Sequence, residues 1–162
     1  MATQHTPCKA VIRAVRAVQD YSVTPDGDGA NRWTIRVDAN RCPRPLEKVL
    51  RTARCSQLVF AFVFPQDFPF QPPFVRLVAP EMDYLTGHVV TGGAICMELL
   101  TMTNSESSWR PTISLDGLML SILMLMADGS PRISSRGAGT TYSEANARMG
   151  FERVAKRYKW DI

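Results

Sequence analysis

The stretch LVFAFVFPQDFPFQPPFVRLV, residues 58–78, decides the fold. Its first seven residues, Leu58–Phe64, are apolar without interruption, which predicts a strand buried on both faces. Four prolines follow between residues 65 and 73, and they exclude both helix and central strand. The next apolar run, Phe74–Val78, predicts a second, short strand. The stretch therefore predicts two strands joined by a stiff turn with aromatic anchors.

Upstream of this stretch the sequence predicts one helix and one further strand. Apolar residues recur at helical spacing over Pro7–Tyr21, with basic residues between them. Proline and glycine interrupt Thr24–Asn31, which predicts a loop, whereas alternation over Trp33–Asp38 predicts a strand. The pattern over Leu46–Arg54 fits more than one structure, so that segment stays open.

Downstream the sequence predicts an irregular segment and two helices. Ala79–Trp109 shows no repeating pattern, yet its apolar and aromatic content argues against disorder. Ser114–Met126 predicts a central buried helix, because apolar residues cover most of its surface. Asp128–Thr141 predicts a loop, and Ser143–Trp160 predicts an amphipathic helix. The residues expected to face the core from that last helix are Met149, Val154 and Tyr158.

Length and composition are those of one folded domain. The chain has 162 residues, enough to bury a hydrophobic core, so residues 1–162 are expected to form a single domain. The mainly apolar segment Leu115–Met126 spans twelve residues, whereas a bilayer requires about 20. Met1–Lys9 has no apolar stretch to act as a secretory signal. We therefore expect a cytoplasmic or nuclear protein.

The four cysteines are Cys8, Cys42, Cys55 and Cys96, and none forms a C-x-x-C pair or lies at metal-ligand spacing from a histidine. We expect four free thiols and no metal site, with the first three serving as small buried hydrophobes. The formal net charge is +4, and a solvated basic surface explains it. No long basic run or aromatic–glycine RNA motif supports nucleic-acid binding.

Several motifs stand in a fixed order around Cys96. The turn at Phe68-Pro69-Phe70 precedes Gly93-x-Ile95-Cys96-Met97-Glu98-Leu99-Leu100, which precedes Trp109-x-Pro111 and an apolar helix. Together, from Leu58 to Met126, they resemble the ubiquitin-conjugating enzyme family, and the Cys-Met-Glu-Leu-Leu wording resembles its divergent Q branch. The resemblance implies an α+β fold with an N-terminal helix, an antiparallel meander of about four strands, a central buried helix and a C-terminal helix.

The resemblance also implies a reaction. Cys96 would carry ubiquitin as a thioester and pass it to an amine of a substrate, usually a lysine. The implied partners are ubiquitin, an activating enzyme, a ligase and a protein substrate, with no nucleic acid and no membrane. No cofactor or metal is implied, because the upstream activating enzyme uses the ATP. By their positions in the family's motifs, the residues expected to bind partners are Phe70, Pro111, Thr112, Lys9 and Arg13, while Trp109 is expected to be a packing anchor.

The sequence departs from the family pattern beside the cysteine. Most members carry His-Pro-Asn starting ten residues before it, whereas this chain has Thr86-Gly87-His88. We hypothesise that a ring N–H of His88 does part of the work of the missing asparagine amide at the oxyanion, the alternative being a solvent-exposed loop histidine. The segment from Cys96 to Trp109 is several residues longer than is usual in the family. The extra residues, Thr103–Ser108, are expected to form a flap near the active site. The acid that orients the attacking lysine would fall at Ile133, and Asp128 is the nearest acid.

Three other functions stay open. A non-catalytic scaffold with this fold would explain the missing His-Pro-Asn and the missing acid, although scaffold relatives usually lose the cysteine. A conjugating enzyme for another ubiquitin-like protein would use the same residues. A basic nucleic-acid-binding domain would bind in a salt-sensitive way. The sequence also leaves open whether the acceptor is a lysine, an N-terminal amine or a hydroxyl.

Overall fold

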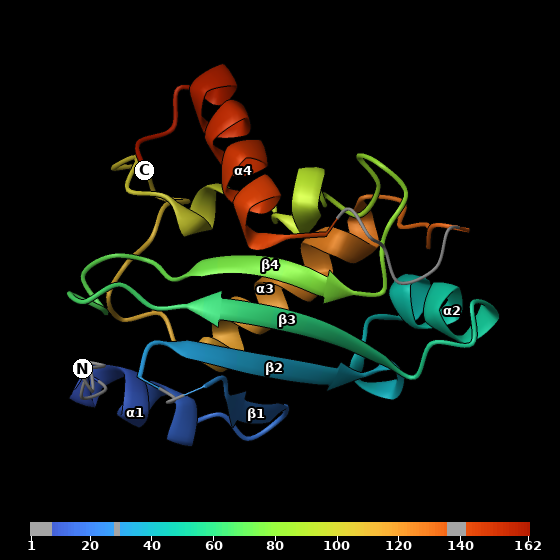
Figure 1. Cartoon of the computed structure of the whole chain (residues 1–162), viewed down its shortest axis with the longest axis horizontal. Coiled ribbons are helices and arrows are strands. Elements are labelled where there is room, and N and C mark those ends of the chain that lie inside the picture. The colour runs from blue at the N-terminus through green and yellow to red at the C-terminus, as the bar shows by residue number, and fades with distance from the viewer. Residues whose placement is uncertain (1–7, 28–29, 136–141) are drawn as a thin grey trace.

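The computed structural model describes residues 8–27, 30–135 and 142–162. Its centre is an antiparallel sheet of four strands in the order β1-β2-β3-β4 (Figure 1). The strands are β1 (Ser22–Pro25), β2 (Arg32–Asp38), β3 (Gln57–Val63) and β4 (Phe74–Ala79). The predicted meander is therefore confirmed, and three of its strands lie where the sequence predicted them.

The sheet buries one of its faces. Ile35 of β2 pairs with Phe60 of β3, which pairs with Leu77 of β4, and all three side chains are fully buried. Along β3, however, buried residues alternate with half-exposed ones. The prediction that this strand is buried on both faces was wrong, because the central helix α3 (Leu115–Asp128) covers only one face of the sheet (Figure 1).

Strand β1 occupies part of a predicted loop. Thr24 and Pro25 lie in this strand and pair with Thr34 and Trp33 of β2, so the prediction of a loop from Thr24 was wrong. Pro25 is tolerated because β1 is an edge strand, where a residue without an N–H breaks no ladder on its open side. The rest of that predicted loop includes residues 28–29, which lie outside the described residues.

The N-terminal helix is shorter than predicted. Helix α1 spans Lys9–Arg16, whereas the prediction extended it to Tyr21. After the helix ends, the backbone N–H of Gln19 donates to Asp116 Oδ2 at 3.3 Å, which fastens the connection to the start of α3. The chain must leave the helix here because β1 begins at Ser22. Pro7, the predicted first residue, lies outside the described residues.

The central helix agrees with the prediction. Ser114 caps α3, since its Oγ accepts a hydrogen bond from the Gly117 N–H at 3.0 Å. Half of its fourteen residues are buried in the core, and Leu120 and Met124 stay exposed on its outer side. No helix among the described residues is long and apolar enough to cross a membrane.

The C-terminal helix α4 (Glu144–Tyr158) begins after Ser143 as predicted but turns a different face inward. Met149 and Tyr158 are exposed, so their predicted inward orientation was wrong, whereas Val154 is partly buried and packs against the core as predicted. The buried residues are Ala147, Gly150, Phe151 and Ala155. Small residues occupy that face because the neighbouring backbone is close: a Cβ on Gly150 would lie 2.8 Å from Thr91 O.

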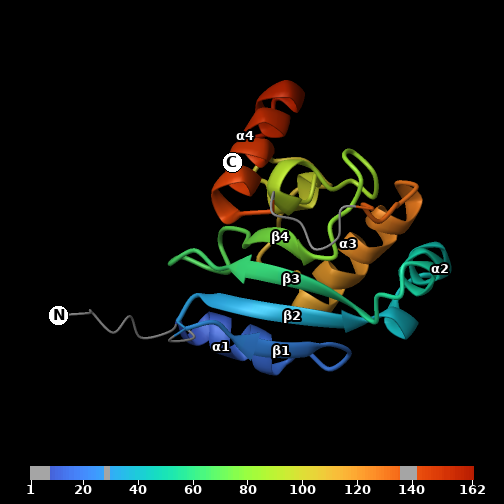
Figure 2. The same cartoon turned by 45° about the vertical axis from the view of Figure 1, so that its right-hand side comes forward.

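The segment that the sequence left open forms a helix. Helix α2 spans Arg44–Thr52, with Pro45 in its first turn, where the missing N–H of proline is harmless. Leu46 and Leu50 point inward and are fully buried. Figures 1 and 2 place α2 at the same end of the sheet, beside α3 and away from α1. Helix α2 is therefore an additional helix between β2 and β3, and it lies next to the central helix α3.

Candidate active site

The four thiols have different surroundings. Burial, with help from nearby carboxylates, raises the pKa of Cys42 to about 12, so this thiol is inert near neutral pH. The sulfurs of Cys8, Cys42 and Cys55 each lie within hydrogen-bonding distance of a backbone carbonyl oxygen, at 3.6–3.7 Å. The sulfur of Cys96 is half-buried and makes no hydrogen bond within the described part of the chain. Cys96 is therefore the thiol left free for chemistry.

A short backbone pairing holds Cys96 in place. Val89 and Ile95 form an isolated antiparallel bridge, and both side chains are buried. The Cys96 N–H donates to the carbonyl oxygen of His88 at 2.9 Å. Cys96 thus stands where this pairing ends, and burial raises the pKa of its thiol above the ordinary value. The Cys96 thiol is therefore harder to ionise than an ordinary, solvated thiol.

The turn before Cys96 depends on two glycines. Thr91–Gly93 form the 3-10 turn η2, in which Gly92 and Gly93 have φ angles of +72° and +89°. A Cβ on Gly92 would lie 2.1 Å from Ala147 N, and a Cβ on Gly93 would lie 2.0 Å from Leu77 O. The turn is therefore wedged between α4 and β4. These glycines are required for that packing, whatever else approaches them.

His88 is adjacent to Cys96 through its backbone. It has a φ of +56°, and its side chain is exposed at the surface. The ring lies against Gly129, which directly follows the last residue of α3: a Cβ built on Gly129 would come within 2.6 Å of His88 Cδ2. The structure therefore places His88 between the C-terminal end of α3 and the isolated Val89–Ile95 bridge that precedes the thiol. No local sequence pattern indicated this contact with Gly129.

No acid occupies the position where one was expected. Ile133 is half-buried and bridges Met82. The side chain of Arg132 reaches Asp83, with Nε and Oδ2 3.6 Å apart. Asp128 is the last residue of α3 and is exposed next to Gly129. Asp128, the nearest acid in the sequence, is thus adjacent to Gly129, the residue that touches His88.

The segment after Cys96 is ordered by hydrogen bonds. Ser105 Oγ donates to Glu98 Oε1 at 2.7 Å, and the Met102 N–H donates to Asp161 O at the same distance. The Asp161 N–H in turn donates to Thr103 Oγ1 at 2.8 Å. The C-terminal residues after α4 therefore fasten the predicted flap. Tertiary contacts of this kind leave no signal in the local sequence pattern.

The predicted partner-binding residues all stay accessible. Phe70 is 68% exposed, and Pro111, Thr112, Lys9 and Arg13 are exposed as well. Trp109 is buried, and its Nε1–H donates to Pro69 O at 2.8 Å, which confirms it as a packing anchor. This bond joins the loop of Pro111 to the turn of Phe70. The predicted residues on these two loops are thus brought to one edge of the molecule.

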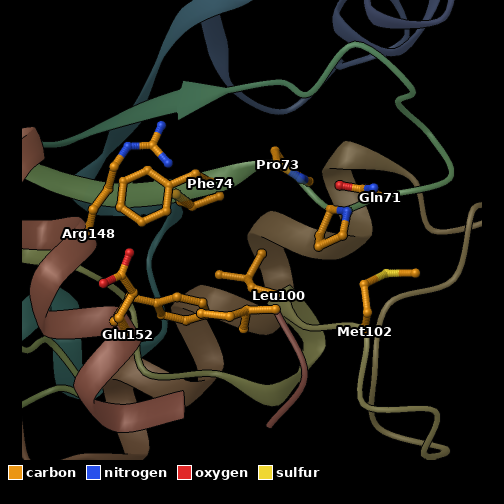
Figure 3. A pocket seen from close by; sticks show the side chains of 11 residues that line it. Gln71, Pro73, Phe74, Leu100, Met102, Arg148 and Glu152 are labelled. Carbon is orange, nitrogen blue, oxygen red and sulfur yellow. The ribbon is translucent and has the colours of Figure 1, made fainter. Parts of the chain in front are cut away.

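A cavity of about 410 Å³ lies between the start of β4 and α4 (Figure 3). Phe74, Leu100, Met102 and Phe151 supply most of its apolar wall. The guanidinium of Arg148 lies over the Phe74 ring, 4.3 Å from its centroid, and closes one side. Neither Cys96 nor His88 lines this cavity. No cluster of residues able to hold a metal ion occurs among the described residues.

Comparisons with known proteins place the chain among relatives. The family model described as ubiquitin-conjugating enzyme matches residues 56–159. Ubiquitin-conjugating enzyme E2 25 of Caenorhabditis elegans is 39% identical over 128 residues, which are 76% of this chain and 32% of that protein. Human ubiquitin-conjugating enzyme E2 Q1 is 28% identical over 141 residues, 85% of this chain and 32% of that protein. The chain thus spans about a third of the length of these two relatives.

A solved structure extends the comparison to the fold. The structure of human ubiquitin-conjugating enzyme E2 G1 superposes with a TM-score of 0.55 at 20% identity, covering 74% of this chain and 94% of that one. This likeness confirms the predicted α+β fold.

Proposed function

Because the chain belongs to the ubiquitin-conjugating enzyme family, we propose that Cys96 takes the C-terminus of ubiquitin from an activating enzyme as a thioester. The ubiquitin then passes to an amine of a substrate protein, usually a lysine, with the help of a ligase. One observation carries the proposal: Cys96 is the one half-buried thiol among the described residues whose sulfur is free of hydrogen bonds.

Both steps are acyl transfers. The Cys96 thiolate attacks the thioester carbonyl carbon, a new C–S bond forms, and the cysteine of the activating enzyme leaves as a thiolate. In the second step the amine nitrogen attacks the same carbon, the bond to Cys96 breaks, and the ammonium proton passes to solvent. The raised pKa of Cys96 is compatible with this chemistry, since the incoming acyl group is already activated and thiolate is a good leaving group.

His88 is proposed to support the oxyanion of the tetrahedral intermediate. Its carbonyl oxygen holds the Cys96 N–H, so its ring starts from a backbone position next to the reacting sulfur. One well-aimed donor to an oxyanion is worth roughly 3 kcal/mol in other acyl-transfer enzymes. Removing the ring in His88→Ala is therefore expected to slow discharge to free lysine, and an unchanged rate would exclude the role.

The accessible edge residues are proposed to bind the partner proteins. Phe70, Pro111 and Thr112 stand on two loops joined by the Trp109 hydrogen bond, and an exposed aromatic residue beside prolines suits a ligase contact. Lys9 and Arg13 give α1 a positive surface, which would steer it toward an acidic region of the activating enzyme.

A scaffold without catalytic activity is the second candidate. The position expected to hold the acid is Ile133, which is engaged in a bridge to Met82, and this observation favours the scaffold. A scaffold would bind ubiquitin or a partner enzyme without forming a thioester.

A charging assay decides between the two. The protein is mixed with activating enzyme, ubiquitin and ATP, and a non-reducing gel is used to detect a thiol-labile adduct. We expect the adduct on the native protein and on Cys55→Ser, the matched control, and at most a thiol-resistant ester on Cys96→Ser. Absence of any adduct, with other ubiquitin-like proteins also tried, would favour the scaffold.

A further inference from the structure

Helix α4 contacts the Cys96 segment on both sides of the thiol. Before the thiol, the turn η2 packs against α4, where a Cβ on Gly92 would lie 2.1 Å from Ala147 N. After the thiol, the residues that follow α4 are hydrogen-bonded to the start of the predicted flap. Figures 1 and 2 accordingly place the C-terminal end of the chain beside this segment. Along the chain, Cys96 therefore lies between two contacts made by α4 and the residues after it.

The end of α4 directs the chain toward the flap. Lys159 has a φ of +57°, and the Trp160 N–H donates to Ala155 O at 2.8 Å, as in a Schellman helix end. The ring of Trp160 also stacks on that of Tyr158, with the centroids 5.2 Å apart. Because the backbone turn and the stacked rings fix this exit, the next residue, Asp161, arrives at a defined position.

Asp161 joins the flap through both of its backbone polar groups. Its carbonyl oxygen accepts from the Met102 N–H at 2.7 Å, and its N–H donates to Thr103 Oγ1 at 2.8 Å. Two bonds to adjacent residues fix both the distance and the direction of the first flap residues relative to α4. The second bond requires a hydroxyl at position 103, so it depends on the identity of that side chain.

Two threonine hydroxyls extend this contact back toward the thiol. Thr103 Oγ1 lies 2.9 Å from Thr101 Oγ1, which donates to the carbonyl oxygen of Glu98 at 2.7 Å. A hydroxyl has one proton, and that of Thr101 is directed to Glu98, so Thr103 is the donor between the two hydroxyls. The bonds therefore run in one direction, from the backbone N–H after α4, through both hydroxyls, to Glu98.

This hydroxyl chain ends next to the thiol and is closed to solvent in its middle. Thr101 is 0% exposed, so water cannot replace a partner that its hydroxyl loses. Glu98 begins the 3-10 turn η3 (Glu98–Leu100), two residues after Cys96. Removal of the hydroxyl at position 103 is therefore expected to disturb the backbone beside the thiol.

From these contacts we propose that Thr103 is a positioning residue for acyl transfer at Cys96, acting through Thr101 and the turn η3. The inference rests on the proposed function for its chemical step, and it assigns the flap a role in that step. With the hydroxyl chain complete, the thiol segment keeps one orientation toward the acyl carbon and the attacking amine. Without it, the turn after the thiol is free to shift, which leaves the thiol more exposed but less well oriented.

Three variants separate the hydroxyl from the packing of the side chain. Thr103→Val keeps the shape of the side chain and removes the hydroxyl, whereas Thr103→Ser keeps the hydroxyl and removes the methyl group. Thr24→Val is the matched control, because the Thr24 hydroxyl accepts from Arg36 Nη1 at 2.9 Å on the edge strand β1. Figure 1 shows β1 on the side of the sheet away from α4, so this control loses one hydroxyl far from the flap.

The first measurement is discharge of the preformed Cys96 thioester to free lysine. The rate constant is taken per charged molecule, so a smaller folded fraction does not lower it. We expect Thr103→Val to lower the rate constant roughly fivefold to tenfold, because small displacements of reacting groups are costly in rate. Thr103→Ser and Thr24→Val are expected to discharge at the native rate.

The second measurement requires no ubiquitin. Alkylation of Cys96 in the folded, uncharged protein is followed by mass spectrometry, and Cys55, another half-buried thiol, is the internal control. We expect Thr103→Val to speed alkylation of Cys96 several-fold and to leave Cys55 unchanged, since a small reagent needs access to the sulfur but no orientation. The opposite signs of the two effects distinguish a loss of positioning from a loss of thiol reactivity.

Several results would overturn the inference. Equal discharge by Thr103→Val and the native protein would do so. Thr103→Ser discharging as slowly as the valine variant would also do so, since the methyl group would then be the cause. A similar loss in Thr24→Val would attribute the effect to general destabilisation. If the native protein forms no thioester, the proposed function fails, and unchanged alkylation of Cys96 in Thr103→Val would separately refute the positioning of the thiol.

Discussion

Replacing Gly93 by alanine tests the packing that positions the turn η2, which precedes Cys96. The substitution meets two separate obstacles: the residue has a φ of +89°, and its new Cβ would lie 2.0 Å from the carbonyl oxygen of Leu77 in β4. The positive φ alone costs about 1–2 kcal/mol for an alanine. Forcing the extra carbon against a buried backbone atom costs a further 1–3 kcal/mol, roughly. We expect the free energy of unfolding to fall by about 2–5 kcal/mol in total.

Gly27 provides the matched control. It also has a positive φ, +61°, but no described atom comes within 4 Å of the position of its Cβ. Gly27→Ala should therefore show only the backbone part of the effect, about 1–2 kcal/mol. Urea unfolding followed by tryptophan fluorescence measures both variants, and the difference between them is the steric part.

The reasoning would be refuted if Gly93→Ala were no less stable than Gly27→Ala. In that case η2 would be able to move away from β4 without penalty, and the glycine would serve only the turn. A large effect has a functional consequence that can be measured on the same samples. Because Gly93 is three residues before Cys96, its displacement should also change the alkylation rate of the Cys96 thiol in the folded protein.

Three further perturbations test contacts away from this turn. Trp109→Phe removes the Nε1–H that reaches Pro69 O at 2.8 Å, and the unsatisfied carbonyl should lower stability by about 1–3 kcal/mol in urea unfolding. Glu144→Gln should lower stability by roughly 0.5–1 kcal/mol at pH 7, since both arginine partners are largely solvated. Hydrogen bonding from Arg32 lowers the pKa of Glu144, so the contribution of this carboxylate to stability is present above the pKa that it has in the unfolded chain. The difference in stability between Glu144→Gln and the native protein should therefore vanish as pH falls through the lowered pKa. Burial raises the pKa of Cys96, so the midpoint of its alkylation rate against pH, followed by mass spectrometry, should lie above about pH 8.5, the ordinary thiol pKa; a midpoint at or below that pH would contradict the burial seen.

The elements that the sequence predicted correctly are those whose pattern is set by the core. Strands β2, β3 and β4 carry apolar residues that pair across the sheet, and α3 is apolar around most of its surface, so their local patterns and tertiary roles agree. Strand β1 was missed because its four residues gain their structure from pairing with β2, which outweighs the local preference of Pro25 and its neighbours for a turn.

Helices were harder to predict from the sequence where small residues make the tertiary contacts. The inward face of α4 includes Ala147 and Gly150, which bring the helix close to η2, whereas the larger Met149 faces solvent. A pattern read from large apolar residues alone therefore selects the wrong face. Helix α2 stayed open for a similar reason: only Leu46 and Leu50 are fully buried, and two buried residues do not define a period.

The candidate site divides in the same way. Cys96 and its separation of eight residues from His88 are evident from motifs that are contiguous in the sequence. The contact of His88 with Gly129 brings together segments that are 41 residues apart, and no local pattern marks it. The family resemblance pointed to Cys96, whereas helix α2, which packs against α3, is an element that this resemblance does not describe.

Backbone contacts explain how Thr86-Gly87-His88 keeps its shape without the usual His-Pro-Asn. The Thr86 hydroxyl donates to Asp83 O at 2.8 Å and accepts from the Arg132 N–H at 3.2 Å. The Gly87 N–H donates to Gly129 O at 2.9 Å, which ties the turn to the end of α3. Gly87 and His88 then take consecutive positive φ angles, so the His88 carbonyl oxygen meets the Cys96 N–H. These bonds fix the turn through the backbone and one hydroxyl, and none of them involves the side chain at position 88.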